Sequence, residues 1–258
     1  MPTRVIEGQA TKISRAMHDI SYDDVHDEIM IANPMAQAIL TFRGGADGEE
    51  PPLRVLQGPL TQIVNPDYGV VVDPVHNELF VAEQEYVLVF PRTATGNVAP
   101  IRVIRGPNTR ISGAKALAVD PINNVLVASS EESMDGGKTF RGWILIFDRT
   151  ANGNVAPRGV IEGPKTLIND RISHLRITPK GWIVAPLRAP RGKEGGLGTI
   201  PVWSVHDNGD IPPRWILGGP KSQIRRSGPI RMTLIPKNKE VLIGGGGTIW
   251  AYSFPEIF

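Results

Sequence analysis

The sequence predicts an all-β protein, a five-bladed β-propeller with four antiparallel strands in each blade. Three observations support this prediction: a short motif that recurs five times, three apolar runs inside each repeat, and an orphan copy of the motif near the amino terminus that matches an incomplete last repeat. Internal repeats with a period of about 20 to 50 residues are typical of solenoids, propellers and arrays. The repeat is therefore the first evidence for the fold.

The recurring motif is an aliphatic run that ends in glycine, followed by proline in the last four copies. A hydroxyl side chain lies three residues after each glycine, and an isoleucine lies two residues further on. The spacings between successive glycines are 50, 48, 57 and 56 residues. The glycines are Gly8, Gly58, Gly106, Gly163 and Gly219.

Each repeat also contains three β-branched or aromatic runs that turn residues separate, which is typical of short strands. The motif adds a fourth, outer strand, and four antiparallel strands make a propeller blade. In the second and third repeats the three runs are Val70–Asp73, Leu79–Ala82 and Tyr86–Phe90, then Leu117–Asp120, Val125–Ala128 and Trp143–Phe147.

The two ends of the chain complement each other. The last repeat has only three expected strands, Met232–Ile235, Glu240–Ile243 and Thr248–Phe254, whereas Arg4–Gly8 is a fourth strand without a blade. We expect this N-terminal strand to complete the last blade and so to remove exposed sheet edges. Residues 1–258 would then form a single domain. An open solenoid would leave both half-blades unexplained.

The blades resemble those of the NHL and lactonase-type repeat propellers, on the residues Gly69–Asp73, Asn77–Ala82 and Val87–Phe90. The resemblance covers nearly the whole chain and concerns blade architecture, although those families usually have six blades. A lactonase-type calcium centre would draw on acids and amides from several blades. The candidates here are Asp19, Asn33, Asp67 and Glu83, while blades three to five offer cations instead.

Composition excludes several classes of site. The chain has no cysteine, which excludes disulfides, thiolate metal sites and cysteine nucleophiles. The net charge is only +2 and no basic block stands out, so we expect no nucleic-acid partner. No segment has the length and apolarity of a membrane span or signal peptide, so we expect a soluble monomer. The sequence does not indicate the cellular compartment.

The first strands carry the most informative asymmetry. Positions one and three residues before the aligned strand ends are apolar in every blade, as with Tyr22 and Ile20, and we expect them to pack between blades. The positions two and four residues before the strand ends carry small or apolar residues in blades two and three, but polar or charged residues in blades four, five and one. Ring closure would gather Asp19, His174, Arg176 and Arg231 in one wedge of the tunnel.

This wedge supports two hypotheses. In the first, the tunnel mouth binds a small polar or anionic molecule, because guanidinium groups suit carboxylates and phosphates. In the second, the protein is a lactonase-like hydrolase or a lyase in which His174 is the base and Arg176 and Arg231 hold an oxyanion, with Asp19 facing them. A plug of salt bridges that fills the tunnel, with no ligand, and a scaffold for protein partners remain as alternatives.

Further candidates for ligand binding lie at the same end of the tunnel. His18, Tyr68 and Lys115 are at the entrances to first strands. Insertions at 130–138 and 188–196 lengthen two of the loops that join second to third strands, and these loops are expected to form a lid or to pair as solvated loops. The insertions contribute Glu131 and Arg188, and the short loops at the same place in blades one and two contribute Asn33 and Glu83. We expect no cofactor; calcium, or zinc on His18 and His174 with an aspartate, is the alternative.

Overall fold

The structure is a computed structural model that describes residues 2–67, 69–187, 198–222, 224, 231–245 and 248–258. Tyr68 and the whole second insertion at 188–196, with Arg188, lie outside the described residues. The chain divides into two compact units. Unit one holds Met1–Gly106 with Ala151–Val155, and unit two holds Pro107–Thr150 with Ala156–Phe258. The expectation of a single domain stays a prediction.

Unit one contains two blades, each an antiparallel sheet whose four strands follow the order of the chain. The strands of blade one are β1 (Asp19–Asp23), β2 (Glu28–Asn33), β3 (Ala38–Arg43) and β4 (Arg54–Gln57). The strands of blade two are β5 (Val70–Asp73), β6 (Glu78–Glu83), β7 (Tyr86–Pro91) and β8 (Arg102–Arg105).

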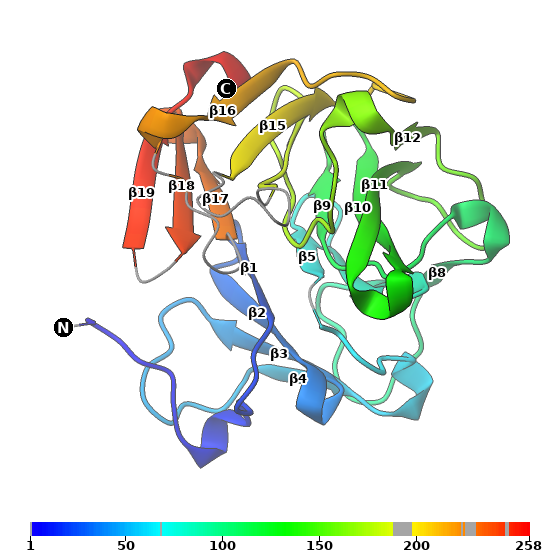
Figure 1. The fold of residues 1–258 in the computed structure, drawn as a ribbon. Helices are drawn as coiled ribbons and strands as arrows, with labels where there is room; N and C mark the ends of the chain where they lie inside the picture. The colour runs from blue at the N-terminus through cyan, green and yellow to red at the C-terminus, as the bar shows by residue number, and fades with distance from the viewer. Residues whose placement is uncertain (1, 68, 188–197, 223, 225–230, 246–247) are drawn as a thin grey trace. The chain divides into compact units, whose positions relative to one another are not determined.

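Unit two contains blades three, four and five, with the same antiparallel order (Figure 1). Blade three has β9 (Leu117–Asp120), β10 (Val125–Met134), β11 (Thr139–Asp148) and β12 (Gly159–Ile161). Blade four has β13 (Arg176–Ile177), β14 (Trp182–Val184), β15 (Thr199–Ser204) and β16 (Trp215–Gly218). Blade five has β17 (Arg231–Ile235), β18 (Glu240–Gly245) and β19 (Thr248–Ser253).

The described helices are short 3-10 turns, and five of them follow the repeat glycines directly. Among the described residues, no helix combines the length and apolarity that crossing a membrane requires. The turns are η1 (Gln9–Thr11), η2 (Pro34–Ala36), η3 (Pro59–Thr61), η4 (Pro107–Thr109), η5 (Asp135–Gly137), η6 (Pro164–Thr166), η7 (Pro220–Ser222), η8 (Pro236–Asn238) and η9 (Pro255–Ile257).

These five blades confirm the predicted fold class: the protein is an all-β, five-bladed β-propeller. The sheet of the last blade has three strands among the described residues, and residues 3–8 form no regular strand. Ile6 nevertheless makes an isolated parallel bridge to Gly48, as outer strands do in other blades. The pairing of Arg4–Gly8 with the last blade stays a prediction.

The outer strands β4, β8 and β12, and the N-terminal segment at Ile6, are each bonded to the linker of the following repeat, a contact that we call the outer latch. In one latch, Gly96 donates its N–H to the Val55 carbonyl over 2.7 Å, and Asn97 Oδ1 accepts the N–H of Leu60 over 2.8 Å. The side-chain amide of Asn97 thereby satisfies a backbone donor of η3, the turn that follows the outer strand β4. The bridges of the four latches are Ile6–Gly48, Leu56–Gly96, Ile104–Gly153 and Ile161–Gly209.

The repeated hydroxyl closes the turn after each glycine. Thr61 is fully buried, donates to the Gly58 carbonyl over 2.6 Å and accepts the N–H of Ile63 over 3.2 Å. Thr166 makes the same two bonds in blade four. The periodic hydroxyl in the sequence is therefore a structural element of the blade, not a catalytic nucleophile.

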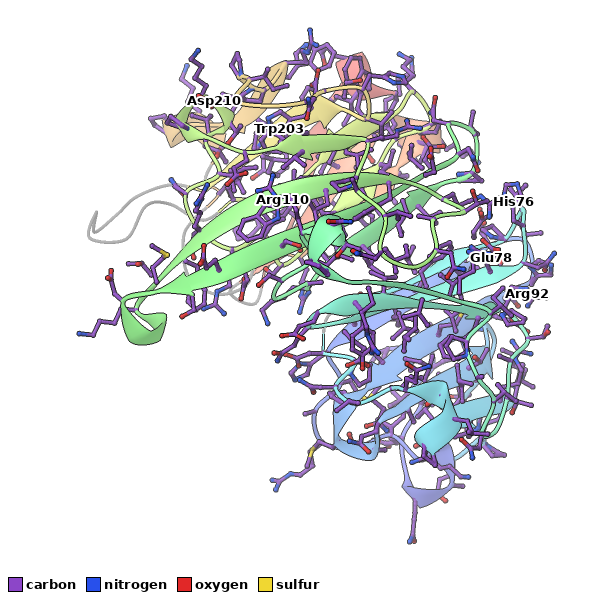
Figure 2. The ribbon with its side chains drawn as sticks, turned by 90° about the vertical axis from the view of Figure 1, so that its right-hand side faces the viewer. His76, Glu78, Arg92, Arg110, Trp203 and Asp210 are labelled. Atoms are coloured by element: carbon purple, nitrogen blue, oxygen red, sulfur yellow. The ribbon has the colours of Figure 1, made fainter. Side chains whose placement is uncertain are left out.

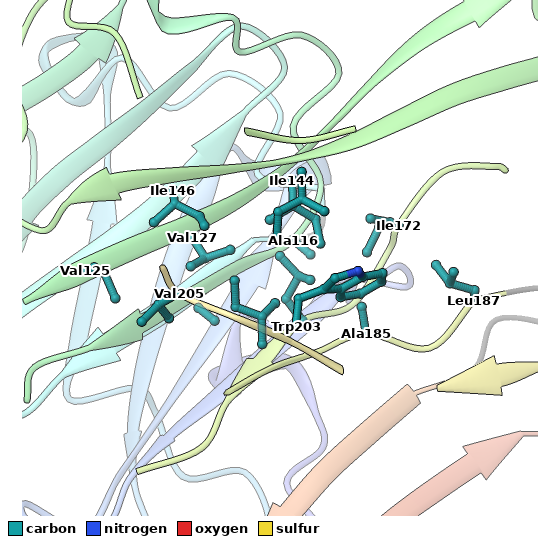
Figure 3. Close-up of a cluster of buried hydrophobic side chains, with 14 residues drawn as sticks. Ala116, Val125, Val127, Ile144, Ile146, Ile172, Ala185, Leu187, Trp203 and Val205 are labelled. Carbon is teal, nitrogen blue, oxygen red and sulfur yellow. The ribbon is translucent and has the colours of Figure 1, made fainter. Parts of the chain in front are cut away.

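Apolar side chains from neighbouring blades of one unit form the core. In unit two, Trp203 lies fully buried between side chains of blades three and four, among them Ala116, Ile172 and Leu187 (Figure 3). Its Nε1–H has no hydrogen-bond partner among the described residues. The equivalent residue is phenylalanine in blades one to three, six residues before each linker glycine. Trp203 therefore fills space between the two blades. Its buried, unsatisfied N–H lowers the stability of the fold by about 1–3 kcal/mol.

One sequence-based expectation needs correction. The insertion at 130–138 is not a loop, because it extends β10 and β11 into a longer hairpin that projects from unit two (Figure 2). Val70 and Val72 are buried against blade one, as expected for residues that pack between blades. The same expectation for Ile20 and Tyr22 on β1 concerns a blade of the other unit and stays a prediction.

Candidate functional site

The best-defined polar cluster surrounds His174, which precedes β13 in blade four. The side chain is buried, with the residue 4% exposed. Its Nδ1 accepts the backbone N–H of Met232, on β17 of blade five, over 3.3 Å. The imidazole ring thus joins the inner strands of two adjacent blades of unit two.

Two arginines hold the chain on either side of this histidine. Arg176 donates from Nη1 to the Leu175 carbonyl over 2.8 Å, and Arg231 donates from Nη1 to the Ser173 carbonyl over 3.4 Å. Ser173 and Leu175 are the two neighbours of His174 in the chain. The guanidinium groups therefore lie close to the imidazole, one from each inner strand.

The surroundings of His174 disfavour its charged form. Burial lowers the pKa of the imidazole well below its usual value, and the positive charges of Arg176 and Arg231 lower it further. The ring is therefore neutral near pH 7. Since Nδ1 accepts a hydrogen bond, the proton of the neutral ring is assigned to Nε2.

Asp19 has a similar role in unit one. Its Oδ2 accepts the N–H of Val70 on β5 over 3.1 Å, and both residues occupy the register positions that His174 and Met232 occupy in unit two. An acceptor at this position satisfies the inner edge of the next blade. Blades two and three have Gly69 and Ala116 there. Because Asp19 and His174 belong to different units, their predicted gathering stays a prediction.

The predicted rim residues lie in local ion pairs. His18 Nδ1 contacts Asp67 Oδ1 in unit one. In unit two, Lys115 Nζ lies 3.9 Å from Glu131 Oε1, which brings together two candidates that the sequence analysis treated separately. Arg171, which the sequence analysis did not select, lies with its Nε 3.9 Å from Glu131 Oε2.

Asn33 and Glu83 bind backbone groups at the ends of second strands. Asn33 donates to the Lys12 carbonyl and accepts from Ser14. Glu83 accepts two backbone N–H groups, those of Val64 at 3.1 Å and Asn65 at 2.9 Å. Burial nevertheless raises the pKa of the Glu83 carboxyl above its usual value. These contacts stabilise the loops that enter the first strands, and a ligand role for either residue stays a prediction.

The site has features that the sequence could not reveal. The Ser173 and Leu175 carbonyls are acceptors for the two arginines, and backbone groups leave no trace in residue type. The acceptor role of His174 could have been found by aligning it with Asp19 and asking what binds the free strand edge. Among the residues with described positions, no group of three or more histidine, aspartate or glutamate side chains is placed to hold a metal ion.

The buried histidine predicts an acid-sensitive fold. The folded protein binds the His174 proton less readily than the unfolded chain does, so its contribution to stability is complete above about pH 6.5 and is lost as the pH falls below that value. We expect the free energy of unfolding to fall by up to about 1.4 kcal/mol per pH unit there. Urea titrations at pH 7.5, 6.5 and 5.5 measure this slope.

The control for this prediction is a second histidine of unit two. His174→Gln should reduce the loss of stability below pH 6.5, whereas His206→Gln should not, since His206 is exposed. Equal slopes in the wild-type protein and His174→Gln would show that His174 does not carry the effect.

Comparisons with known proteins support the architecture. No model of a protein family matches the sequence, and no curated protein matches it either. Solved structures do match: hydrazine synthase from Kuenenia stuttgartiensis, with a TM-score of 0.59 at 14% identity, and the Dos1 propeller, with 0.53 at 14%. A nidogen/laminin complex matches with a TM-score of 0.52 at 15% identity. The likeness shows the fold.

The coverage of these structures is unequal. The alignments cover 93%, 92% and 81% of this chain, but only 57%, 56% and 66% of the respective matched chains. This chain therefore spans somewhat over half the length of the structures that it resembles. Their activities and partners are not carried over.

Proposed function

We propose that this propeller is a ligand-binding module that binds a small anionic molecule at the inner strands of blades four and five. The observation that carries the proposal is the convergence of Arg176 and Arg231 on the chain around buried His174. Guanidinium groups are the usual partners of carboxylates and phosphates, because they combine permanent charge with several N–H donors. Inner strands of a propeller are also where side chains of different blades converge.

The alternative hydrolase or lyase gains less support from the same contacts. A general base needs a ring nitrogen that can take a proton near neutral pH. Nδ1 of His174 accepts the Met232 N–H, and burial together with the two arginines disfavours the protonated ring. Binding an anion requires only the N–H donors of Arg176, Arg231 and His174. We therefore favour the binding role over the lactonase-like hydrolase or lyase reaction.

A scaffold role rests on a different part of unit two. The β10–β11 hairpin extends beyond the register of β9 and β12, and residues 132–139 are exposed. Such a hairpin offers a surface for a protein partner without involving His174. This candidate predicts that shortening the hairpin leaves anion binding intact.

Anion titrations test the proposal. We expect acetate and sulfate to perturb the amide resonances of residues 173–176 and 231–233 in a saturable way. Arg176→Gln and Arg231→Gln should each weaken the affinity by about tenfold or more, because each removes a charged hydrogen-bond donor. Arg158→Gln is the matched control, since it removes the same charge from a surface pair with Asp148. An equal loss in all three variants would indicate general electrostatic attraction and contradict the proposal.

A further inference from the structure

We propose that His174 sets the ligand class of this site: its Nε2–H acts as a donor beside the guanidinium groups of Arg176 and Arg231, and together these groups select a fully ionised oxyanion over a neutral polar molecule. The inference rests on the proposed function, and it deepens that function by naming what the site accepts. The chemical class is a carboxylate, sulfate or phosphate group that presents only acceptor oxygens.

The contacts of His174 determine which ring nitrogen carries the proton. The hydrogen bond from Met232 N–H occupies Nδ1 with an acceptor role. The same register position in blade one holds Asp19, whose carboxylate can only accept when ionised and does accept the N–H of Val70. Asp19 and His174 thus have the same role: each accepts a backbone N–H from the inner strand of the next blade. This fixes Nε2 as the protonated nitrogen of His174.

The side chains of Arg176, Arg231 and His174 offer hydrogen-bond donors to a ligand. Arg176 and Arg231 carry only donors, and Nε2–H adds one more. The two carbonyls nearest to His174, those of Ser173 and Leu175, already accept from these arginines. A ligand hydroxyl or amide N–H would find no acceptor on the two guanidinium groups or on Nε2–H, whereas each oxygen of an ionised oxyanion could accept from them.

The charges of the two arginines also act on the imidazole of His174. The charged groups that act on His174 are Arg176 on β13 and Arg231 on β17, and both oppose a third positive charge. The ring therefore supplies a hydrogen bond without titrating over the neutral range. We expect the affinity for sulfate, which stays ionised, to change less than threefold between pH 8 and pH 6.

Nitrogen NMR of the full chain, labelled with 15N-histidine, tests the ring directly. The expected spectrum is that of the Nε2–H tautomer from pH 8 to pH 6, with the Nε2 resonance shifting on addition of sulfate. A proton on Nδ1, or titration of His174 near the usual histidine pKa, would overturn the inference.

Two variants test the donor against the acceptor. His174→Gln keeps both an acceptor for Met232 N–H and a donor, so sulfate affinity should fall by less than about tenfold. His174→Asp keeps the acceptor, as Asp19 does in blade one, but replaces the donor with a negative charge, so affinity should fall by about a hundredfold or more. Thermal melts verify that each variant folds; if His174→Asp does not, His174→Gln and the NMR shift decide.

The outcomes separate the two proposals. If Arg176→Gln abolishes sulfate binding while His174→Asp binds like the wild-type protein, the role of His174 is wrong and the anion site stands. If acetamide competes with acetate at equal concentration, the site does not select ionised ligands and this inference is also wrong. If the wild-type protein binds neither sulfate nor acetate, the proposed function itself falls.

Discussion

Replacing Gly58 with alanine should lower the free energy of unfolding by about 3 kcal/mol or more. Gly58 has φ 124° and ψ 167°, a backbone region that only glycine adopts readily. A Cβ atom there would lie 2.6 Å from Cγ and Oδ1 of Asn97. Moving Asn97 away would break its bond with the Leu60 N–H and open an outer latch. Urea titration of the purified variant measures the loss.

The matched control is Gly96, on the other side of the same latch. Its φ is also positive, at 72°, but a Cβ atom would meet nothing within 4 Å. Gly96→Ala should therefore cost only the backbone strain, about 1–2 kcal/mol. If Gly58→Ala proved no more destabilising than Gly96→Ala, the close contact with Asn97 would not be the cause.

Replacing Glu28 with alanine should destabilise the protein by about 3–5 kcal/mol, because it would leave largely buried Arg54 without its carboxylate and Arg92 with only its longer, 3.7 Å contact to Asp23. Arg54 Nη2 lies 2.5 Å from Glu28 Oε2, and Arg92 Nη1 contacts the same oxygen. The side chains of Glu28 and Arg92 are only 11% and 10% exposed. The shift of the urea midpoint, with the denaturant slope checked for change, measures the effect.

A surface pair of the same unit is the control. Arg43 and Glu50 form two short hydrogen bonds, but the pair is exposed to solvent and screened by it. Glu50→Ala should therefore barely move the unfolding midpoint. Comparable losses for Glu28→Ala and Glu50→Ala would mean that burial of the Glu28 cluster does not determine its contribution.

The repeat made the blade architecture predictable. Turn residues, apolar runs and a glycine at nearly constant spacing place each strand, and the observed bounds of β5 and β9 match the predicted runs. The insertion at 130–138 was wrongly expected to be a loop. Backbone pairing between Glu131–Met134 and Thr139–Gly142 continues the strands past the polar side chains.

The candidate site was predictable only in part. Alternation along the inner strands predicted His174, Arg176 and Arg231 on one face; in the structure both arginines donate to carbonyls that flank His174 in the chain. Burial and tautomer were not predictable, because they depend on Met232 N–H in a strand 58 residues away. Asn33 and Glu83 were selected for their polarity, whereas their described partners lie in nearby loops: a backbone carbonyl and the Ser14 hydroxyl for Asn33, and two backbone N–H groups for Glu83.

The outer latch also has a consequence for synthesis on the ribosome. Each latch joins residues that lie 40 to 49 positions apart in the chain, as with Leu56 and Gly96 or Ile104 and Gly153. A nascent chain therefore cannot close one latch until most of the following repeat has been translated. Folding would proceed with a delay of one repeat, and a graft or deletion of a blade should be cut after the linker glycine, so that both halves of a latch stay in one piece.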